Sequence, residues 1–394
     1  MKNICFTLIA STLCVNISAQ QLENLGKNVN SKFSEIRPTI SADGNTLYYV
    51  LEGSPQNVNF KKDKRAQDVW YVTRVDDSTW SDPVHCPSPI NIAKDNAVFW
   101  VSPDGNRLLL RGAFENGNYL GRGISMCNRT ADGWTNPQRL QINDYAKMAV
   151  DNYAGASLSN DGKTLLLYFS EERNSNLNDM YVSHLLDDGN WSRPLKMGNV
   201  INLDDYDEIS PFLASDNLTL YFASNRPGGK GFYDIWMTKR LDNSWTVWTE
   251  PVNMGAPINT EGWEAYFSID AKGQYGYLST SNKTFGGTDI ARIKLNETQR
   301  PQMVAMVYGK IYNASTGKPM EADLHYDLVP GETAEGNAIA FVDGTYKVTL
   351  PFGKKIFYPC FSQQLFLCNR HTRFYRSCGL YGVKKRSLSS AGYQ

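Results

Sequence analysis

The chain has 394 residues, and its 40 Lys and Arg residues balance 40 Asp and Glu residues. The balance is uneven: residues 1–19 hold one base, residues 354–394 hold eight, and neither segment holds an acid. Residues 20–353 therefore carry a net charge of about −9, which excludes nucleic acid as a partner because phosphate binding needs a basic surface. The 22 Tyr, 17 Phe and 9 Trp residues, with 31 Gly, favour strands and tight turns, so we expect an all-β fold.

The N-terminus carries one base and an apolar run to Ile17, followed by Ser18-Ala19. This pattern predicts a signal peptide over residues 1–19, too short to span a bilayer. Cys14 suggests a lipoprotein, but Leu13 stands where a small residue is expected. No other stretch approaches membrane length, so we expect no transmembrane segment and export across the inner membrane to the periplasm or outer membrane.

A segment of the type Ser-x-Asp-Gly, followed by an aliphatic and aromatic run, occurs five times at intervals of 55 to 61 residues. Asp-Gly supplies the positive φ of a tight hairpin, and the run after it is typical of a strand buried on both faces. Asn217 replaces the glycine in the fourth copy, and the fifth copy is the weakest. The predicted turn residues are Asp43, Gly44, Asp104, Gly105, Asp161, Gly162, Asp216 and Gly273.

Three further columns follow these turns. They are an Asp-hydrophobic segment at 68–70, 179–181, 234–236 and 289–291, Trp-x-x-Pro at 80–83, 134–137, 191–194 and 248–251, and Ile-Asn at 90–91, 142–143, 201–202 and 258–259. We interpret the first two columns as third and fourth strands, since Pro is tolerated on the free edge of an outer strand. Four strands in such a repeat form one blade of a β-propeller.

The fifth repeat lacks the Trp-x-x-Pro strand, and the missing piece occurs at the other end of the mature chain. Residues 21–26 match residues 251–255, and each segment is followed by a hydrophobic residue and Asn. Pairing the N-terminal strand with the fifth blade removes two open sheet edges. The sequence therefore predicts a closed five-bladed β-propeller over residues 20–299.

The fourth repeat shows a family resemblance most plainly, in Asp207-Glu208, Ser210-Pro211-Phe212, Leu220-Tyr221-Phe222-Ala223-Ser224-Asn225-Arg226-Pro227-Gly228-Gly229 and Tyr233-Asp234-Ile235-Trp236. It resembles the WD40-like, TolB-type propeller repeat of bacterial cell-envelope proteins, over about 21–296. The version is similar to that found ahead of OmpA-type peptidoglycan-binding domains in Bacteroidetes. The resemblance implies envelope proteins as partners, with contact to peptidoglycan through a C-terminal domain missing from this chain.

Residues 300–353 resemble the carboxypeptidase regulatory-like, transthyretin-like β-sandwich, in Tyr308-Gly309-Lys310-Ile311-Tyr312, Ser315-Thr316-Gly317-Lys318-Pro319 and Asp343-Gly344-Thr345-Tyr346-Lys347. The match stops at Gly353, so we expect a partial sandwich. Residues 354–394 form an atypical tail with three Cys and no acid. Our hypothesis for this tail is a frameshifted or truncated reading, and the alternative is a genuine basic tail.

One column places Glu35, Asn96, Glu208 and Glu264, with Tyr153 in the third blade, eight residues before the Asp position of each turn. These residues begin the innermost strands, so we expect them to ring one mouth of the channel and to bind a cation or a sugar. Glycosidases with five blades use carboxylates that converge on such a channel. The alternative is a structural role, with each Glu hydrogen-bonded to neighbouring backbone.

Exposed loops provide further candidates. Arg226 and Lys230 lie in a Gly-rich loop, and the insertion 52–67 carries four bases, so both loops are candidate surfaces for protein partners. The acidic segment 204–208 lacks the glycine of an EF-hand loop, so we interpret it as a solvated loop and not as a calcium site. Cys86 and Cys127 leave a disulfide open, because sequence spacing does not test it.

Catalytic signatures are scarce. Gly155-Ala156-Ser157-Leu158-Ser159 lacks the second Gly of a nucleophile elbow, and the four His residues and the Cys spacing match no metal site. We therefore expect no catalytic residues, no metal and no cofactor. The sequence leads us to expect a non-catalytic envelope scaffold that binds protein partners through propeller loops. The alternative is a carbohydrate-binding or glycoside-hydrolysing propeller that uses the Glu35, Glu208 and Glu264 column.

Overall fold

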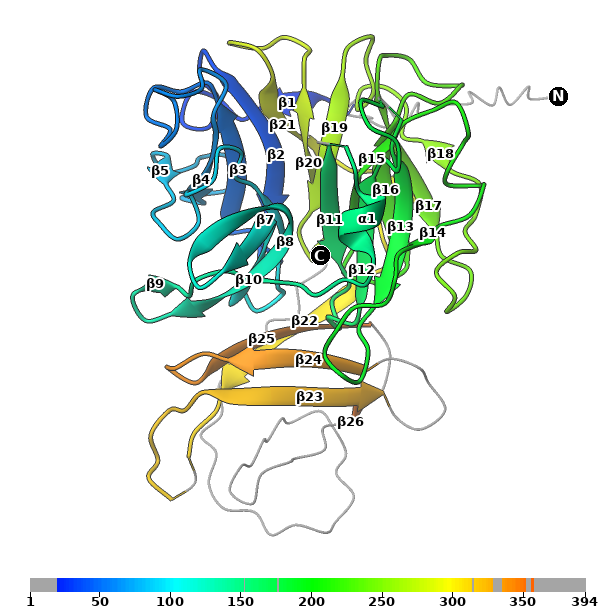
Figure 1. Ribbon diagram of the computed structural model, residues 1–394. Coiled ribbons are helices and arrows are strands. Elements are labelled where there is room, and N and C mark those ends of the chain that lie inside the picture. The colour runs from blue at the N-terminus through cyan, green and yellow to red at the C-terminus, as the bar shows by residue number, and fades with distance from the viewer. Residues whose placement is uncertain are drawn as a thin grey trace, which may run out of the picture.

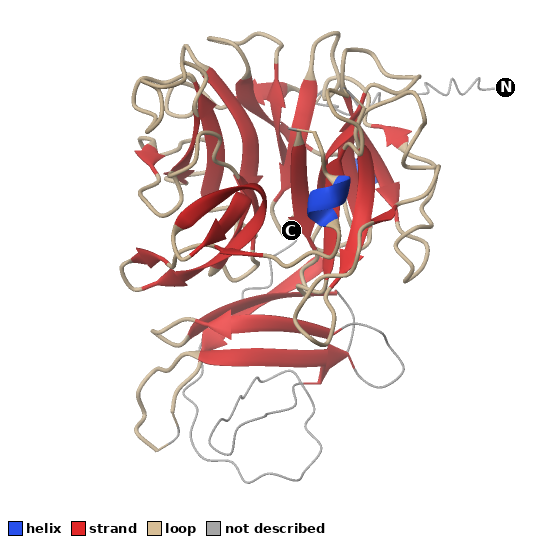
Figure 2. Ribbon diagram, viewed as in Figure 1, coloured by secondary structure: helices blue, strands red, loops and turns tan. Residues whose placement is uncertain are grey.

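The structure is a computed structural model that describes residues 20–357 except 152, 176, 314, 329–334 and 352–355. Strands account for nearly all of the regular structure, and a four-residue helix, α1 (Tyr145–Met148), joins the second and third blades (Figure 2). Within the described residues, no helix has the length and apolar character needed to cross a membrane. The predicted signal peptide and the tail after residue 357 lie outside the described residues.

Five antiparallel sheets stand around a common axis, which confirms the expected five-bladed β-propeller (Figure 1). The innermost strands contact one another in a closed ring, β2 to β6, β11, β15, β19 and back to β2. The strands of the first four blades are β2 (Ser34–Ile40), β3 (Thr46–Glu52), β4 (Gln67–Thr73) and β5 (Val84–His85); β6 (Val98–Val101), β7 (Arg107–Glu115), β8 (Asn118–Thr130), β9 (Gly133–Trp134) and β10 (Gln138–Arg139); β11 (Ala154–Leu158), β12 (Thr164–Phe169), β13 (Asp179–His184) and β14 (Leu195–Lys196); and β15 (Glu208–Leu213), β16 (Thr219–Ser224), β17 (Asp234–Lys239) and β18 (Val252–Asn253).

The fifth blade is assembled from both ends of the propeller. It contains β19 (Glu264–Ile269), β20 (Tyr275–Thr280) and β21 (Asp289–Lys294), and its outer strand is β1 (Leu22–Asn24). Leu22 lies opposite Ile293 in this antiparallel pair. The prediction that the mature N-terminus completes the fifth blade is therefore confirmed, and no blade edge of β21 is left open to another chain.

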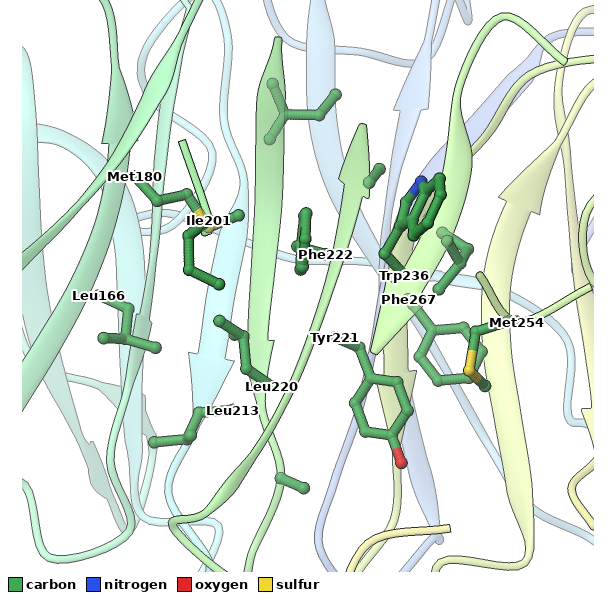
Figure 3. Packing of buried hydrophobic residues seen from close by; sticks show 14 of the residues in the cluster. Leu166, Met180, Ile201, Leu213, Leu220, Tyr221, Phe222, Trp236, Met254 and Phe267 are labelled. Carbon is green, nitrogen blue, oxygen red and sulfur yellow. The ribbon is translucent and has the colours of Figure 1, made fainter. Parts of the chain in front are cut away.

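The hairpin between the first two strands of each blade owes its shape to one backbone position. Its φ is 74° at Gly44, 75° at Gly105, 72° at Gly162, 54° at Asn217 and 64° at Gly273, the left-handed region that Gly and Asn tolerate best. The strand after the turn is buried on both faces in β12 and β16. In the fourth blade its side chains pack between the neighbouring blades, as Leu220, Tyr221 and Phe222 do in Figure 3.

The Trp-x-x-Pro column differs from our expectation of a fourth strand. Trp80, Trp191 and Trp248 form isolated bridges to the end of the third strand, and all three are buried. The fourth strand is only two residues long and begins directly after the proline in β5, β10, β14 and β18. Proline lacks an N–H, so the ladder starts one residue later than the motif suggests.

The Ile-Asn column has a role that the sequence did not reveal. Asn91, Asn202 and Asn259 each use the side-chain amide to pair with both backbone groups of one residue of the third strand, at 2.8–2.9 Å. The amide thereby replaces a peptide group at the point where the short fourth strand has ended. Asn30 does the same for the fifth blade.

The partial sandwich lies across one face of the propeller (Figure 1). It consists of β22 (Val304–Lys310) paired with β25 (Thr345–Pro351), and of β23 (Ala322–Leu328) between β24 (Glu335–Ala340) and β26 (Ile356–Phe357). Residues from this part touch the Asp-Gly turns of successive blades: Lys347 Nζ lies 2.5 Å from Asp43, and the Ile339 N–H donates to Asp104 at 3.1 Å. The Gln302 N–H likewise donates to Asp216. This face of the channel is therefore covered by the sandwich.

Candidate functional site

The centre of the propeller contains a small cavity of about 30 Å3, lined by residues from the middle of the five innermost strands and by Tyr168 of β12. Aromatic rings supply much of this lining, with Phe99 from β6, Tyr168 and Tyr266 from β19. Arg37 from β2 is the charged side chain among the lining residues. The cavity is far smaller than the roughly 300–1,000 Å3 of a usual ligand pocket, so it has room only for a small group.

A bulge in the innermost strand turns these side chains toward the axis. The ladder shifts register next to Arg37, Ser210 and Tyr266, whose φ values of 56°, 53° and 57° lie in the left-handed region. This backbone conformation is costly for residues other than Gly, and bulges of this kind redirect a side chain at functional sites. The freed N–H groups bond to neighbouring blades, from Arg37 to the Ser279 hydroxyl and from Tyr266 to the Ser210 hydroxyl.

Arg37 is surrounded by rings. Its guanidinium lies 4.1 Å from the Tyr266 ring centre and 5.5 Å from that of Phe99, and it donates a 2.7 Å hydrogen bond to the Tyr168 hydroxyl. Burial raises the pKa of Tyr266 to about 12 although Arg37 opposes the shift, so this phenol remains neutral. The centre of the channel is therefore positively charged and aromatic.

The predicted mouth residues Glu35, Asn96, Glu208 and Glu264 are brought to equivalent places at or just before the innermost strands, but they are buried, and none of them lines the central cavity. Asn96 accepts a hydrogen bond from the Ala93 N–H at 2.9 Å, and Glu264 accepts one from the Thr260 N–H at 2.9 Å. Each side chain thus holds the turn that leads into its strand. Tyr153 differs from the rest of the column, because it is 62% exposed.

Two of these glutamates sit in environments that favour protonation. Burial raises the pKa of Glu35 to about 7 against the opposing Ser31 hydroxyl, and its Oε2 atom has no hydrogen-bond partner among the residues that the structure describes. Burial also raises the pKa of Glu208, although Arg226 lies 3.0 Å away and opposes the shift. A protonated carboxyl group is the form that donates a proton in glycoside hydrolysis.

The loop candidates separate into one buried residue and one exposed residue. Lys230 is exposed as expected, but the expectation of an exposed Arg226 is wrong, since its guanidinium pairs with Glu208 and bonds to the Val200 carbonyl. The solvated interpretation of segment 204–208 also fails in part, because Asp207 and Glu208 are buried. Asp207 accepts hydrogen bonds from Asn178 and Tyr233 instead of facing solvent.

The turn aspartates act within their own turns. The carboxylates of Asp43, Asp104 and Asp161 each accept the backbone N–H two residues further on, at 2.9–3.0 Å, and the hydroxyl of the serine two residues earlier. Asp216 accepts the Leu218 N–H in the same way. These contacts are Asx-turns that stabilise the hairpin locally.

Neither the cysteines nor the metal-ligating residue types form a site in the described part of the chain. Cys86 and Cys127 are buried free thiols in one hydrophobic cluster, so they form no disulfide. Among the described residues, no group of three or more His, Cys, Asp or Glu lies close enough together to hold a metal ion.

Sequence reasoning missed Arg37 and the ring of aromatic residues around it. One signal was available: the third position of Glu35-Ile36-Arg37-Pro38 and Glu208-Ile209-Ser210-Pro211 changes while its neighbours repeat. A position that keeps its backbone conformation but changes its chemistry between blades points to a role outside the repeat framework. That reading depends on knowing that the position faces the axis, which the sequence does not show.

No family model matches the chain, and no curated protein matches it. Solved structures with a similar fold include an exo-β-1,3-galactanase from Phanerochaete chrysosporium, 10% identical with a TM-score of 0.42, covering 88% of this chain and 98% of the galactanase. An α-L-arabinofuranosidase from Lactobacillus brevis is 11% identical with a TM-score of 0.41, covering 69% of this chain and 95% of that enzyme. A periplasmic gluconolactonase from Pseudomonas aeruginosa is 11% identical with a TM-score of 0.37, covering 82% and 87%.

These comparisons correct one expectation from the sequence. We expected a scaffold without catalytic activity, but several solved structures of similar fold are glycoside hydrolases, so that interpretation is withdrawn. At such identities and TM-scores the likeness identifies no substrate and no residue of this chain.

Proposed function

We propose that this chain is a carbohydrate-active propeller that holds its sugar at the open mouth of the channel. The observation that carries the proposal is the aromatic channel with Arg37 at its centre. Sugar rings present apolar faces and polar edges, and aromatic side chains with a few placed polar groups suit both. The sandwich covers the turn face, so the ligand enters from the opposite face, where the innermost strands begin.

Tyr153 is the residue best placed to meet a sugar ring at this mouth. It stands directly before β11, whose Ala156 lines the cavity, and its side chain is exposed. A sugar ring stacked on Tyr153 would therefore lie at the mouth of the channel, close to the cavity.

Glu35 is the candidate proton donor for hydrolysis. It lies two residues before Arg37 in β2, and its pKa of about 7 keeps a substantial protonated fraction at neutral pH. Its side chain is fully buried, so contact with a glycosidic oxygen requires the mouth to rearrange around the bound sugar. Glycoside hydrolysis uses a pair of carboxyl groups, and the second would come from Glu208 or Glu264 of the same column.

Binding and sugar release from a panel of neutral and acidic oligosaccharides test the proposal with the purified mature chain. We expect Tyr153→Ala to weaken binding at least tenfold and Glu35→Gln to lower release at least a hundredfold. Phe232→Ala is the matched control, because Phe232 is an exposed aromatic residue on a loop of another blade. If no oligosaccharide of the panel is bound and none is cleaved, the proposal is wrong.

We further propose that the protein works in the periplasm or at the outer membrane among envelope proteins. The predicted signal peptide and the resemblance to TolB-type repeats of Bacteroidetes support this location. Fractionation of cells that express the tagged chain tests it, with recovery in the cytoplasm as the contrary outcome.

A further inference from the structure

Three arginines are buried in the described part of the chain, and Arg37 differs from the other two. Arg226 forms an ion pair with Glu208 at 3.0 Å, and Arg292 forms one with Glu23 at 2.8 Å. Among the described residues, no carboxylate lies within ion-pairing distance of Arg37. Arg37 is therefore a buried charge without a counterion from the described protein.

The hydrogen bonds of Arg37 are also incomplete. The half-buried Arg74 also stacks on a ring, 4.5 Å from that of Trp80, and its guanidinium donates to the Gly44 and Asp77 carbonyls and to the Tyr277 hydroxyl. The Arg37 guanidinium donates only to Tyr168 among the described residues. A guanidinium has five N–H donors, so most of those of Arg37 are left for an acceptor that enters the channel.

A second group in the same cavity lacks a partner. Ser268 lines the cavity from β19, is 2% exposed, and its hydroxyl has no hydrogen-bond partner in the described chain. A buried hydroxyl without a partner is unfavourable, as is a buried unpaired charge. The free N–H groups of Arg37 and the unpartnered hydroxyl of Ser268 come from different blades and line one small cavity, which indicates a site for an oxyanion.

We propose that this cavity binds the carboxylate of an acidic sugar, with Arg37 as the ion-pair partner and Ser268 as a hydroxyl donor. The cavity volume of about 30 Å3 leaves room for a small anionic group and not for a sugar ring. The ring remains at the mouth near Tyr153, which makes this inference rest on the proposed function. Arg is the residue of choice for such planar, two-point recognition of a carboxylate.

Isothermal titration of the mature chain compares each acid with its neutral parent: D-galacturonate with D-galactose, and D-glucuronate with D-glucose. We expect each uronate to bind about 10- to 100-fold more tightly than its parent, since charge-assisted hydrogen bonds distinguish them. Galactose 6-phosphate and inorganic phosphate are titrated separately, because a phosphate group also presents oxyanions to the site. Tighter binding of the phosphate-bearing sugar than of galacturonate would overturn the assignment to a carboxylate.

Ser268→Ala and Arg37→Lys test the two donors. Removal of an unpartnered hydroxyl leaves the fold intact, so Ser268→Ala should lower uronate affinity severalfold while the affinity for galactose stays unchanged. Arg37→Lys keeps the positive charge but loses the planar pair of guanidinium donors. This variant should therefore lose most of its preference for the uronate over the neutral sugar. Arg74→Lys is the matched control and should retain the preference.

The outcomes separate the two proposals. If neutral and acidic sugars bind equally well, or if both variants keep the preference for the uronate, the anion site is wrong while the carbohydrate function stands. If no sugar binds but phosphate binds in an Arg37-dependent way, the anion chemistry stands without the carbohydrate ligand, and the carboxylate assignment falls with the proposed function.

Discussion

The side chain of Asn30 forms two hydrogen bonds of 2.8 Å with the backbone of Ile290, one donated to the carbonyl and one accepted from the N–H. The two residues are 260 positions apart in the chain. Together with the pairing of β1 and β21, this contact joins the start of the propeller to its last blade. The ring is therefore held closed by backbone and side-chain hydrogen bonds and not by a covalent link.

Asn30→Ala should destabilise the propeller. The substitution leaves the Ile290 N–H buried without its partner, while the Ile290 carbonyl keeps the 3.2 Å hydrogen bond from the Leu25 N–H. We therefore expect the free energy of unfolding in urea to fall by about 1 to 3 kcal/mol. Asn259→Ala provides the comparison within a blade that is not at the closure, and the exposed Asn118→Ala is the neutral control. An unchanged unfolding midpoint for Asn30→Ala would show that the closure depends on β1 pairing alone.

Stability should depend on pH through Glu35. Its pKa is about 7 in the folded protein and about 4.5 in the unfolded chain, so the folded state binds more protons between these values. The stabilisation is complete below pH 4.5 and is lost as the pH rises through 7. The difference in unfolding free energy between the wild type and Glu35→Gln should therefore change by roughly 3 kcal/mol between pH 4.5 and 8.

The exposed Glu172→Gln serves as the control for this titration and should follow the wild type at every pH. Parallel pH profiles for wild type and Glu35→Gln would mean that Glu35 ionises normally, and would also remove it as a proton donor.

The two buried cysteines should be unreactive in the native protein. Burial raises the pKa of Cys127 to about 12, and burial raises that of Cys86 as well, so neither forms the reactive thiolate at pH 8. Site-resolved mass spectrometry after iodoacetamide treatment should find both positions labelled only in urea. A disulfide-linked peptide pair would contradict the free thiols of the structure.

Docking of the sandwich should depend on Lys347. Lys347→Glu places a carboxylate beside Asp43, where the lysine now lies at 2.5 Å, and like charges at this distance repel. We expect faster hydrogen exchange at the turns around Asp43 and Asp104, with unchanged protection of the blade strands. Lys318→Glu, on an exposed sandwich position, is the control. Equal exchange in both variants would show that docking does not need this ion pair.

Repetition made the architecture readable from the sequence. Each Asp-Gly turn and each buried run repeats a local rule, so five copies predicted five blades, and the match between residues 21–26 and 251–255 predicted the closure. Local rules of this kind depend on backbone conformation and hydrophobic pattern, which a sequence states directly.

Only the tertiary structure decided which polar residues face ligand and which face protein. The sequence suggests an exposed loop position for Arg226, but Arg226 is buried against Glu208. Arg37 lies inside a repeat motif, and none of the described carboxylates forms an ion pair with it. Side-chain direction at Arg37 follows from a bulge, and its surroundings follow from Phe99, Tyr168 and Tyr266 of three other blades. Blade order brings these residues together across the axis, and no spacing within one repeat encodes that meeting.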